Sequence, residues 1–241
     1  MKSYIALFVV FLISFLIAQA PASLTQPYLN QASPIQVQSL SGTIWSGSAQ
    51  LDGVESVEWR MQPWALLTGV LEIELQAKIN ADNFASTTAT LHPSSAVSLT
   101  ELYAQITTEE LQKWLPNTPI MAQGVLQISD AQAQWDSPND TLPKHAQGLV
   151  VARKLDVFGT QLGDYQAKAL LDEDSFNVLV TSLPQATVKT ELNVVGTLGK
   201  TAQIQGDLIP QTQATRDLFK QFSIPEKLNF TQPISNLTLN K

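Results

Sequence analysis

The most regular feature of this sequence is an alternation of apolar and polar residues with a period of two. Between Leu71 and Ile79 every odd-numbered position is apolar and every even-numbered position is polar. Val57, Trp59 and Met61 alternate with charged residues in the same way. Successive side chains of a strand point to opposite faces, so the pattern predicts antiparallel strands with one buried and one wet face. Similar runs predict strands over residues 84–91, 96–106, 124–135, 148–158, 165–171, 176–181, 188–198 and 202–209.

Turns and helices account for the short segments between these runs. Polar residues at 172–175 and 199–201 predict hairpin connections. Residues 62–69 predict a short helix, with Pro63 at its first position and Gly69 just beyond its end. Residues 107–110 form a capping box that predicts a helix ending before Pro116, and residues 212–222 predict a third helix. The predicted fold is therefore mainly β, mostly antiparallel, with two or three short helices.

The N-terminus carries an uncharged apolar run, residues 4–18, directly after Lys2. As a helix this run would be roughly 23 Å long, somewhat less than a hydrocarbon core of about 30 Å. A cleaved signal peptide is one interpretation, because Ala18 and Ala20 match the small-x-small cleavage pattern. Pro21 would follow that cut directly, which favours an uncleaved transmembrane helix instead. The residues of this membrane anchor would include Tyr4, Leu7, Phe8, Phe11, Leu12, Phe15 and Leu16.

This interpretation sets the domain organisation. Residues 1–20 are the predicted membrane anchor, with the N-terminus in the cytoplasm because Lys2 precedes the span. Residues 21–34 mix Pro, Ser, Gln and Asn without periodicity and predict a juxtamembrane linker. Residues 35–241 form the predicted exported β-rich domain.

Composition excludes several classes of function. The formal net charge is −7, and no stretch of the chain is strongly basic, so nucleic acid is not an expected partner. The chain has no cysteine, which removes thiol nucleophiles, cysteine-ligated zinc and disulfides.

A search for catalytic chemistry finds no active site. His92 and His145 lie far apart and lack the spacing of a helical metal pair. Neither a nucleophile elbow nor a phosphate-binding glycine loop is present. The acidic run Asp172, Glu173 and Asp174 lacks the alternating ligand spacing of a calcium loop. We therefore expect no enzyme activity, no cofactor and no metal.

A dense pattern of glycines and aromatic residues stands out near the start of the domain. It comprises Gly42, Trp45, Gly47, Trp59, Pro63, Trp64, Leu67 and Gly69. In one interpretation, the three tryptophans pack together where a hairpin meets the short helix, with glycines that allow close approach. In the other, they form an exposed aromatic docking site for a partner.

This pattern carries a resemblance to a known family. The segments 42–47 (GTIWSG), 57–59 (VEW) and 63–69 (PWALLTG) resemble the type II secretion system protein N family. The resemblance implies a non-enzymatic component of a secretion machine, without cofactors, in the inner membrane of a Gram-negative bacterium. The implied location is a single span with the bulk of the chain in the periplasm. The implied partners are other secretion proteins of the inner membrane and periplasm, together with membrane lipid around the anchor.

A more distant resemblance leaves a second function open. The strand layout is similar to that of AsmA-like envelope proteins, whose curved sheets form a groove with an apolar inner face. A curved sheet of this kind implies an apolar ligand such as lipid in the β groove. The side chains that would line such a groove, or fill a closed core instead, are Leu71, Ile73, Leu75, Val194, Ile204 and Leu208.

Overall fold

The computed structural model describes residues 19–27, 30, 36–63, 69–114 and 122–233, and the chain divides into two compact units, Met1–Pro93 and Ser94–Lys241. The predicted anchor over residues 4–18 lies outside the described residues. Among the described residues, no helix has the length and apolarity needed to cross a membrane.

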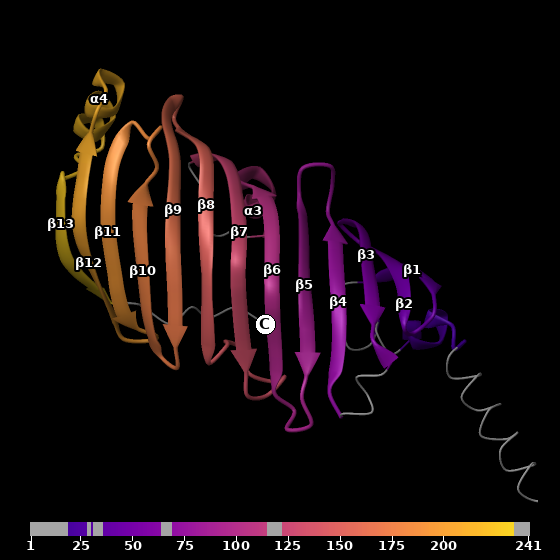
Figure 1. Ribbon diagram of the computed structural model, residues 1–241. Helices are drawn as coiled ribbons and strands as arrows, with labels where there is room; N and C mark the ends of the chain where they lie inside the picture. Colours follow the sequence, from indigo (N-terminus) through magenta and orange to yellow (C-terminus); the bar gives the residue numbers. More distant parts are fainter. Residues whose placement is uncertain (1–18, 28–29, 31–35, 64–68, 115–121, 234–241) are drawn as a thin grey trace, which may run out of the picture. The chain divides into compact units, whose positions relative to one another are not determined.

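The first unit is an antiparallel sheet of five strands in chain order (Figure 1). The strands are β1 (Val37–Gly42), β2 (Ser46–Leu51), β3 (Val54–Met61), β4 (Leu71–Lys78) and β5 (Phe84–Leu91). A short 3-10 helix, η1 (Ala22–Thr25), precedes them and packs against β1. Part of the predicted linker is therefore helical and lies on the sheet.

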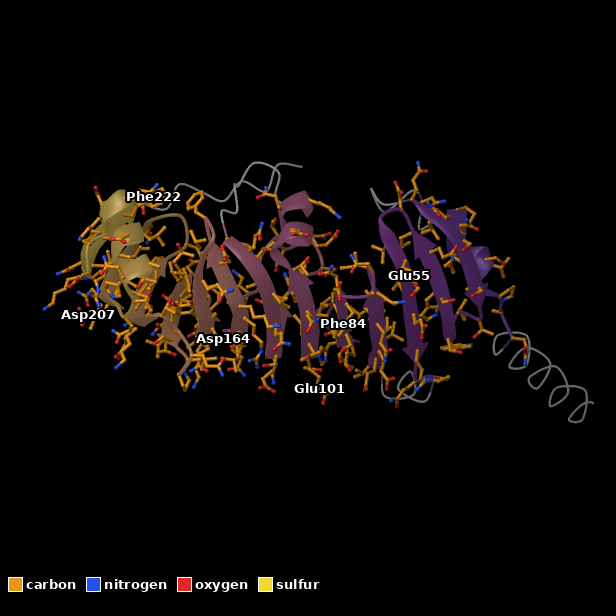
Figure 2. The ribbon with its side chains drawn as sticks, turned by 90° about the horizontal axis from the view of Figure 1, so that it is seen from above. Glu55, Phe84, Glu101, Asp164, Asp207 and Phe222 are labelled. Carbon is orange, nitrogen blue, oxygen red and sulfur yellow. The ribbon has the colours of Figure 1, made fainter. Side chains whose placement is uncertain are left out.

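The second unit is an antiparallel arrangement of longer strands, again adjacent in chain order. It contains β6 (Val97–Thr107), β7 (Ala122–Trp135), β8 (His145–Val157), β9 (Thr160–Asp172), β10 (Ser175–Ser182), β11 (Val188–Thr197), β12 (Thr201–Pro210) and β13 (Lys227–Pro233). The helices α3 (Thr108–Trp114) and α4 (Gln213–Gln221) follow β6 and β12. Both helices lie on one face of this sheet, and Asp164 and Asp207 project from the other (Figure 2).

The prediction of a mainly β, antiparallel, curved fold with few helices is confirmed. Each predicted strand has an observed counterpart, and both predicted hairpin turns join neighbouring strands, at Asp172↔Ser175 and near Gly199. The strands β1, β2 and β13 were not delimited from the sequence, because their apolar residues are too few to give a clear alternation. The predicted helices after residues 107 and 212 are α3 and α4, whereas residues 64–68 of the helix predicted over 62–69 lie outside the described residues.

Bulges adjust the alternation in three neighbouring strands of the second unit. The register shifts between Leu99 and Leu102 in β6, and comparable shifts occur in β7 and β8. A non-glycine residue with positive φ lies in each of these bulges: Glu101 (54°), Asp130 (51°) and Lys154 (52°). A bulge adds one residue and increases the local twist. The three bulges therefore keep apolar residues on the same face of strands that are too long for an unbroken period of two.

The buried core is small for a chain of this length. The buried apolar residues among those described are Ala22, Val37, Ala49, Ile106, Ala131, Tyr165, Val188, Ala202 and Leu218. No described residue of β3 or β4 is buried, and none of β5 is. Leu71, Ile73, Leu75, Val194, Ile204 and Leu208 are all partly exposed rather than enclosed. The apolar faces of both units are thus only partly removed from water.

Candidate functional site

The glycine and aromatic pattern forms the β1–β2 turn and the strands beside it. Gly42 has φ 86° and pairs with Gly47 across the hairpin. Inside the turn the amide of Thr43 donates to the carbonyl of Ser46 at 2.9 Å. The Thr43 hydroxyl in turn accepts from the amides of Trp45 and Ser46 at 3.3 and 3.2 Å. The turn is therefore fixed mainly by its own backbone and one hydroxyl.

The indole of Trp59 lies directly over Gly47. Gly47 pairs with Trp59 across β2 and β3, and a Cβ added to Gly47 would be 2.6 Å from Cζ2 of that indole. The indole Nε1 donates to the carbonyl of Ile44 at 3.2 Å. Only a glycine permits so close an approach of ring and backbone. Trp59 therefore closes the turn from one side, in the manner that the packing interpretation predicts for one of the three tryptophans.

The other residues of the pattern are distributed around this centre. Trp45 accepts through its carbonyl from the amide of Met61 at 2.6 Å, which joins the turn to the end of β3. Pro63 is exposed. Gly69 has φ 77° and lies close to Pro93. Trp64 and Leu67 lie outside the described residues, so the predicted packing of three tryptophans stays a prediction, as does the docking alternative.

A second candidate site is an apolar cavity on the face of the second unit that carries α4. The cavity has a volume of about 430 Å³ and is lined by alternate residues of β8 to β12 together with α4. Its apolar floor includes Val150, Val180 and Leu208, and α4 contributes Leu218 and Phe219. Its size lies within the range of small-molecule pockets.

Two polar side chains of this cavity, Tyr165 and Thr190, are hydrogen bonded within the protein. The Tyr165 hydroxyl donates to the carbonyls of Leu162 and Val188, at 3.1 and 3.2 Å. Burial raises the pKa of this phenol above its ordinary value. Thr190 donates through its hydroxyl to Val188 at 3.3 Å. An occupant would therefore meet mostly hydrocarbon, with the amide of Gln166 as the remaining polar side chain of the lining.

Helix α4 lines one side of the cavity; a capping box begins it, and an aromatic stack joins its end to the β8–β9 turn. The Thr212 side chain accepts from the amide of Thr215, whose side chain accepts in return from the amide of Thr212. Phe222, at the end of the helix, stacks on Phe158 with ring centroids 5.0 Å apart and planes inclined by 12°. Phe158 has φ 52° in the β8–β9 turn, an unusual conformation for a bulky residue. Figure 2 shows Phe222 beside α4 at this end of the unit.

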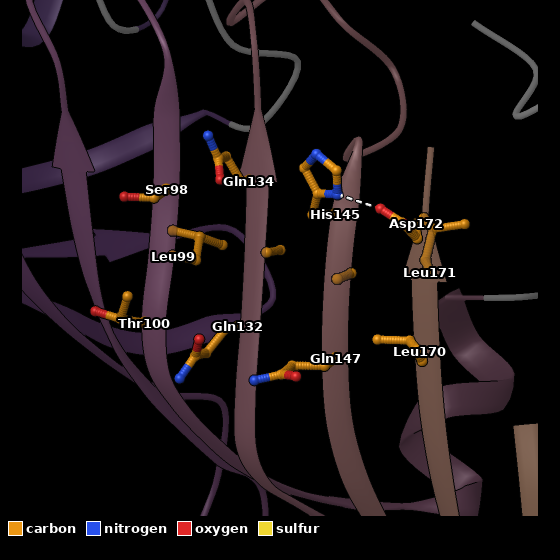
Figure 3. Close-up of a pocket in the computed structure, with 12 residues that line it drawn as sticks. Ser98, Leu99, Thr100, Gln132, Gln134, His145, Gln147, Leu170, Leu171 and Asp172 are labelled. Atoms are coloured by element: carbon orange, nitrogen blue, oxygen red, sulfur yellow. Dashed lines mark hydrogen bonds and ion pairs between the residues drawn. The ribbon is translucent and has the colours of Figure 1, made fainter. Parts of the chain in front are cut away.

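A third concave region contains one of the two histidines. Nδ1 of His145 lies 2.7 Å from Oδ1 of Asp172, and Ser98, Gln134 and Gln147 line the same pocket (Figure 3). Both the histidine and the aspartate are largely exposed. Register places Gln134 between Ser98 and His145, so the serine is two strands away from the imidazole and cannot be activated by it.

Metal chemistry finds no support in the part of the chain that the structure describes. No group of three or more His, Cys, Asp or Glu residues there could hold a metal ion. Glu173 and Asp174 occupy the hairpin turn between β9 and β10, as the sequence indicated. The prediction that the protein uses no metal stays a prediction.

The fold and these sites define a class of protein. It is an antiparallel β protein in which two sheet units each present an apolar face that is only partly buried. The sequence model of a known family, "Type II secretion system (T2SS), protein N", matches residues 33–224. The match covers most of the chain, so the chain belongs to the type II secretion system protein N family and is a component of that system. No curated protein and no solved structure matches the chain.

Proposed function

We propose that this protein is a non-enzymatic, membrane-anchored assembly component of the type II secretion system. The anchor is the apolar segment 4–18, which places the N-terminus in the cytoplasm and the two β units in the periplasm, on the inner membrane. The units act by binding other secretion-system proteins rather than by catalysis.

The observation that carries this proposal is the incomplete burial of the first unit. Its sheet has an apolar face formed by alternate residues such as Val57, which pairs with Ala77 across β3 and β4, and Leu75, two residues before Ala77. None of these residues is buried. Burial of apolar surface is favourable by about 25 cal/mol per Å², so an apolar sheet face that stays partly exposed forgoes part of its stabilisation. A partner protein that covers this face would recover it.

Photocrosslinking in cells tests the proposal with a matched control in the same strand. A photoreactive amino acid at Val57 would project from the apolar face, and the same amino acid at Glu58 would project from the opposite face. We expect crosslinks from position 57 to other secretion-system proteins, and their loss in a strain that lacks the rest of the machinery. Position 58 should give far fewer.

Two outcomes would contradict the proposal. Equal crosslinking from both positions would show that the apolar face has no special role. Complete extraction of the full-length protein from membranes by alkaline carbonate would show that residues 4–18 do not anchor it.

A second candidate function is favoured by the cavity under α4. We propose that this cavity holds the hydrocarbon chain of a lipid, because its lining is mostly apolar and the hydroxyls of Tyr165 and Thr190 are hydrogen bonded within the protein. A helix has a diameter of about 10 Å, so a volume of this size would hold only about one helical turn of a peptide. Arg216 and Lys220 are exposed one turn apart on α4 and form no ion pair with a described residue. They offer cations to an anionic headgroup beside the cavity.

Vesicles that contain a phospholipid with a diazirine in its acyl chain test this second function on the full-length protein. We expect crosslinked peptides from β8 to β12, reduced by Phe219→Glu in the cavity wall. Ala214→Glu, at an exposed position of the same helix, is the control and should leave them unchanged. Crosslinks confined to residues 4–18, or equal effects of the two variants, would exclude this function.

A further inference from the structure

The segment that follows the predicted anchor is fixed to the first unit by hydrogen bonds. The amide of Ile44, in the β1–β2 turn, donates to the carbonyl of Ala20 at 3.0 Å. Pro21 forms an antiparallel bridge with Thr43. These contacts attach residues 20 and 21 to the turn that contains Gly42 and Trp45. We call this attachment of residues 20 and 21 to the β1–β2 turn the clamp.

Further contacts extend the clamp along β1. Ala22, the first residue of η1, is only 1% exposed. The Gln26 side chain donates to the carbonyl of Val37 at 3.2 Å, and the amide of Val37 donates to Oδ1 of Asn30 at 2.9 Å. The described residues between 20 and 30 therefore belong to the folded unit and do not form a free tether.

This arrangement leaves little chain between the apolar segment and the clamp. The apolar run ends at Ala18, and Ala20 already accepts the first hydrogen bond from the turn. Two extended residues span at most about 7 Å. If residues 4–18 cross the membrane, the β1–β2 turn must lie within that distance of the end of the span.

The surface at this end of the unit has a composition suited to a lipid interface. No charged residue occurs between Lys2 and Asp52, although the whole chain is 15% charged. The uncharged stretch includes η1, β1, the β1–β2 turn and β2. Leu24 in η1 is 64% exposed, and Trp45 in the turn is partly exposed. Tryptophan is favoured at the membrane–water interface, and a surface without charges avoids the cost of moving them out of water.

We propose that the end of the first unit formed by η1 and the β1–β2 turn docks onto the headgroup layer of the membrane that holds the N-terminal segment. This inference rests on the proposed anchor. The docking surface carries no cation, so zwitterionic lipid is sufficient and the contact does not depend on salt. The clamp makes the unit a rigid extension of the span, which fixes the direction in which its sheet leaves the membrane.

The absence of cysteine allows a direct test with single labels on the full-length chain. Ser46→Cys places a label at the first residue of β2 and Asp52→Cys places one just beyond its last residue, and both positions are exposed. The two positions lie roughly 20 Å apart along the strand. A nitroxide in the headgroup region of phosphatidylcholine vesicles should therefore quench a fluorophore at position 46 at least about threefold more than the same fluorophore at position 52. Raising the salt concentration should leave this ratio unchanged.

A longer tether distinguishes docking from simple proximity. Insertion of Gly-Ser-Gly-Ser between Ala18 and Gln19 leaves the clamp intact but frees the unit from the span. We expect the difference between positions 46 and 52 to persist, because the surface itself binds the interface. Equal quenching at the two positions, or loss of the difference on insertion, would overturn the inference. Failure of the labelled protein to float with vesicles after an alkaline carbonate wash would instead refute the proposed anchor.

Discussion

Replacement of Gly47 by alanine tests how the β1–β2 turn is packed. Gly47 has an ordinary φ, so the cost of the substitution arises from the atoms that the added methyl group meets. That methyl would be 2.6 Å from Cζ2 and 2.9 Å from Cη2 of the Trp59 indole, and would also collide with the carbonyl oxygen of Ser41. Carbon atoms prefer separations of about 3.5–4.0 Å, so the ring must move by roughly 1 Å.

The expected cost follows from two contributions. Overpacking of this kind costs about 1–3 kcal/mol. Movement of the indole also breaks the hydrogen bond from its Nε1 to the carbonyl of Ile44, worth about 1 kcal/mol. We therefore expect Gly47→Ala to lower the free energy of unfolding by about 2–4 kcal/mol, a large part of the about 5–15 kcal/mol typical of a folded protein.

Gly53→Ala is the matched control for this substitution. Gly53 has φ 79° and no atom within 4 Å of an added Cβ, so its cost is conformational only, about 1 kcal/mol. The entropy that alanine removes from the unfolded chain is the same at both positions. Pulse proteolysis of the full-length protein across a urea series in mild detergent measures both free energies.

Rescue by Trp59→Phe gives a second measure of the same contact. Phenylalanine lacks the two indole atoms that collide with the added methyl group, so the double variant should be more stable than the sum of the single effects by about 1 kcal/mol. The packing argument is refuted if Gly47→Ala costs no more than Gly53→Ala, or if the effects of Gly47→Ala and Trp59→Phe simply add.

Three further outcomes follow from the second unit. Burial raises the pKa of Tyr165, so its pKa in the folded state exceeds its value in the unfolded chain. The protonated phenol therefore contributes stability that is fully present below about pH 10. This stability is lost as the pH rises through the folded-state pKa. Urea unfolding between pH 8 and 11 should show this loss, and Tyr165→Phe should abolish it while costing about 1 kcal/mol at neutral pH through the lost bond to Val188. Glu101→Gly should raise stability by about 0.5–1 kcal/mol, because glycine adopts the positive φ of that bulge without strain; a loss on urea unfolding would contradict the bulge geometry. Phe222→Ala should weaken the docking of α4 by about 1 kcal/mol through loss of the stack on Phe158, seen as faster hydrogen exchange in α4 with little change in the strands.

The amino-acid sequence by itself determined the fold class and the family. Alternation at residues 71–79 predicted a strand that the structure delimits as β4, because one apolar face is enough to specify extended backbone. The capping box after residue 107 located α3, since its hydrogen bonds are local in the chain. The pattern of Gly42, Trp45 and Gly47 carried the family resemblance that the match over residues 33–224 confirmed.

Some signals were present in the sequence but become interpretable only beside the structure. Leu99 and Leu102 are three residues apart, as are Ile128 and Ala131, and each such interval coincides with a bulge. The uncharged stretch from residue 3 to 51 extends well past the apolar run into β1 and β2. A period of two does not by itself distinguish a bulge from the end of a strand.

Only the tertiary structure decided which distant residues meet. The bond from Ile44 to Ala20 turns part of an expected linker into a clamp, and the stack of Phe222 on Phe158 places α4 over the cavity. These contacts join segments far apart in the chain, and no local periodicity encodes them. An apolar face indicates only that a residue avoids water; what covers that face depends on the packing of the whole molecule and its surroundings.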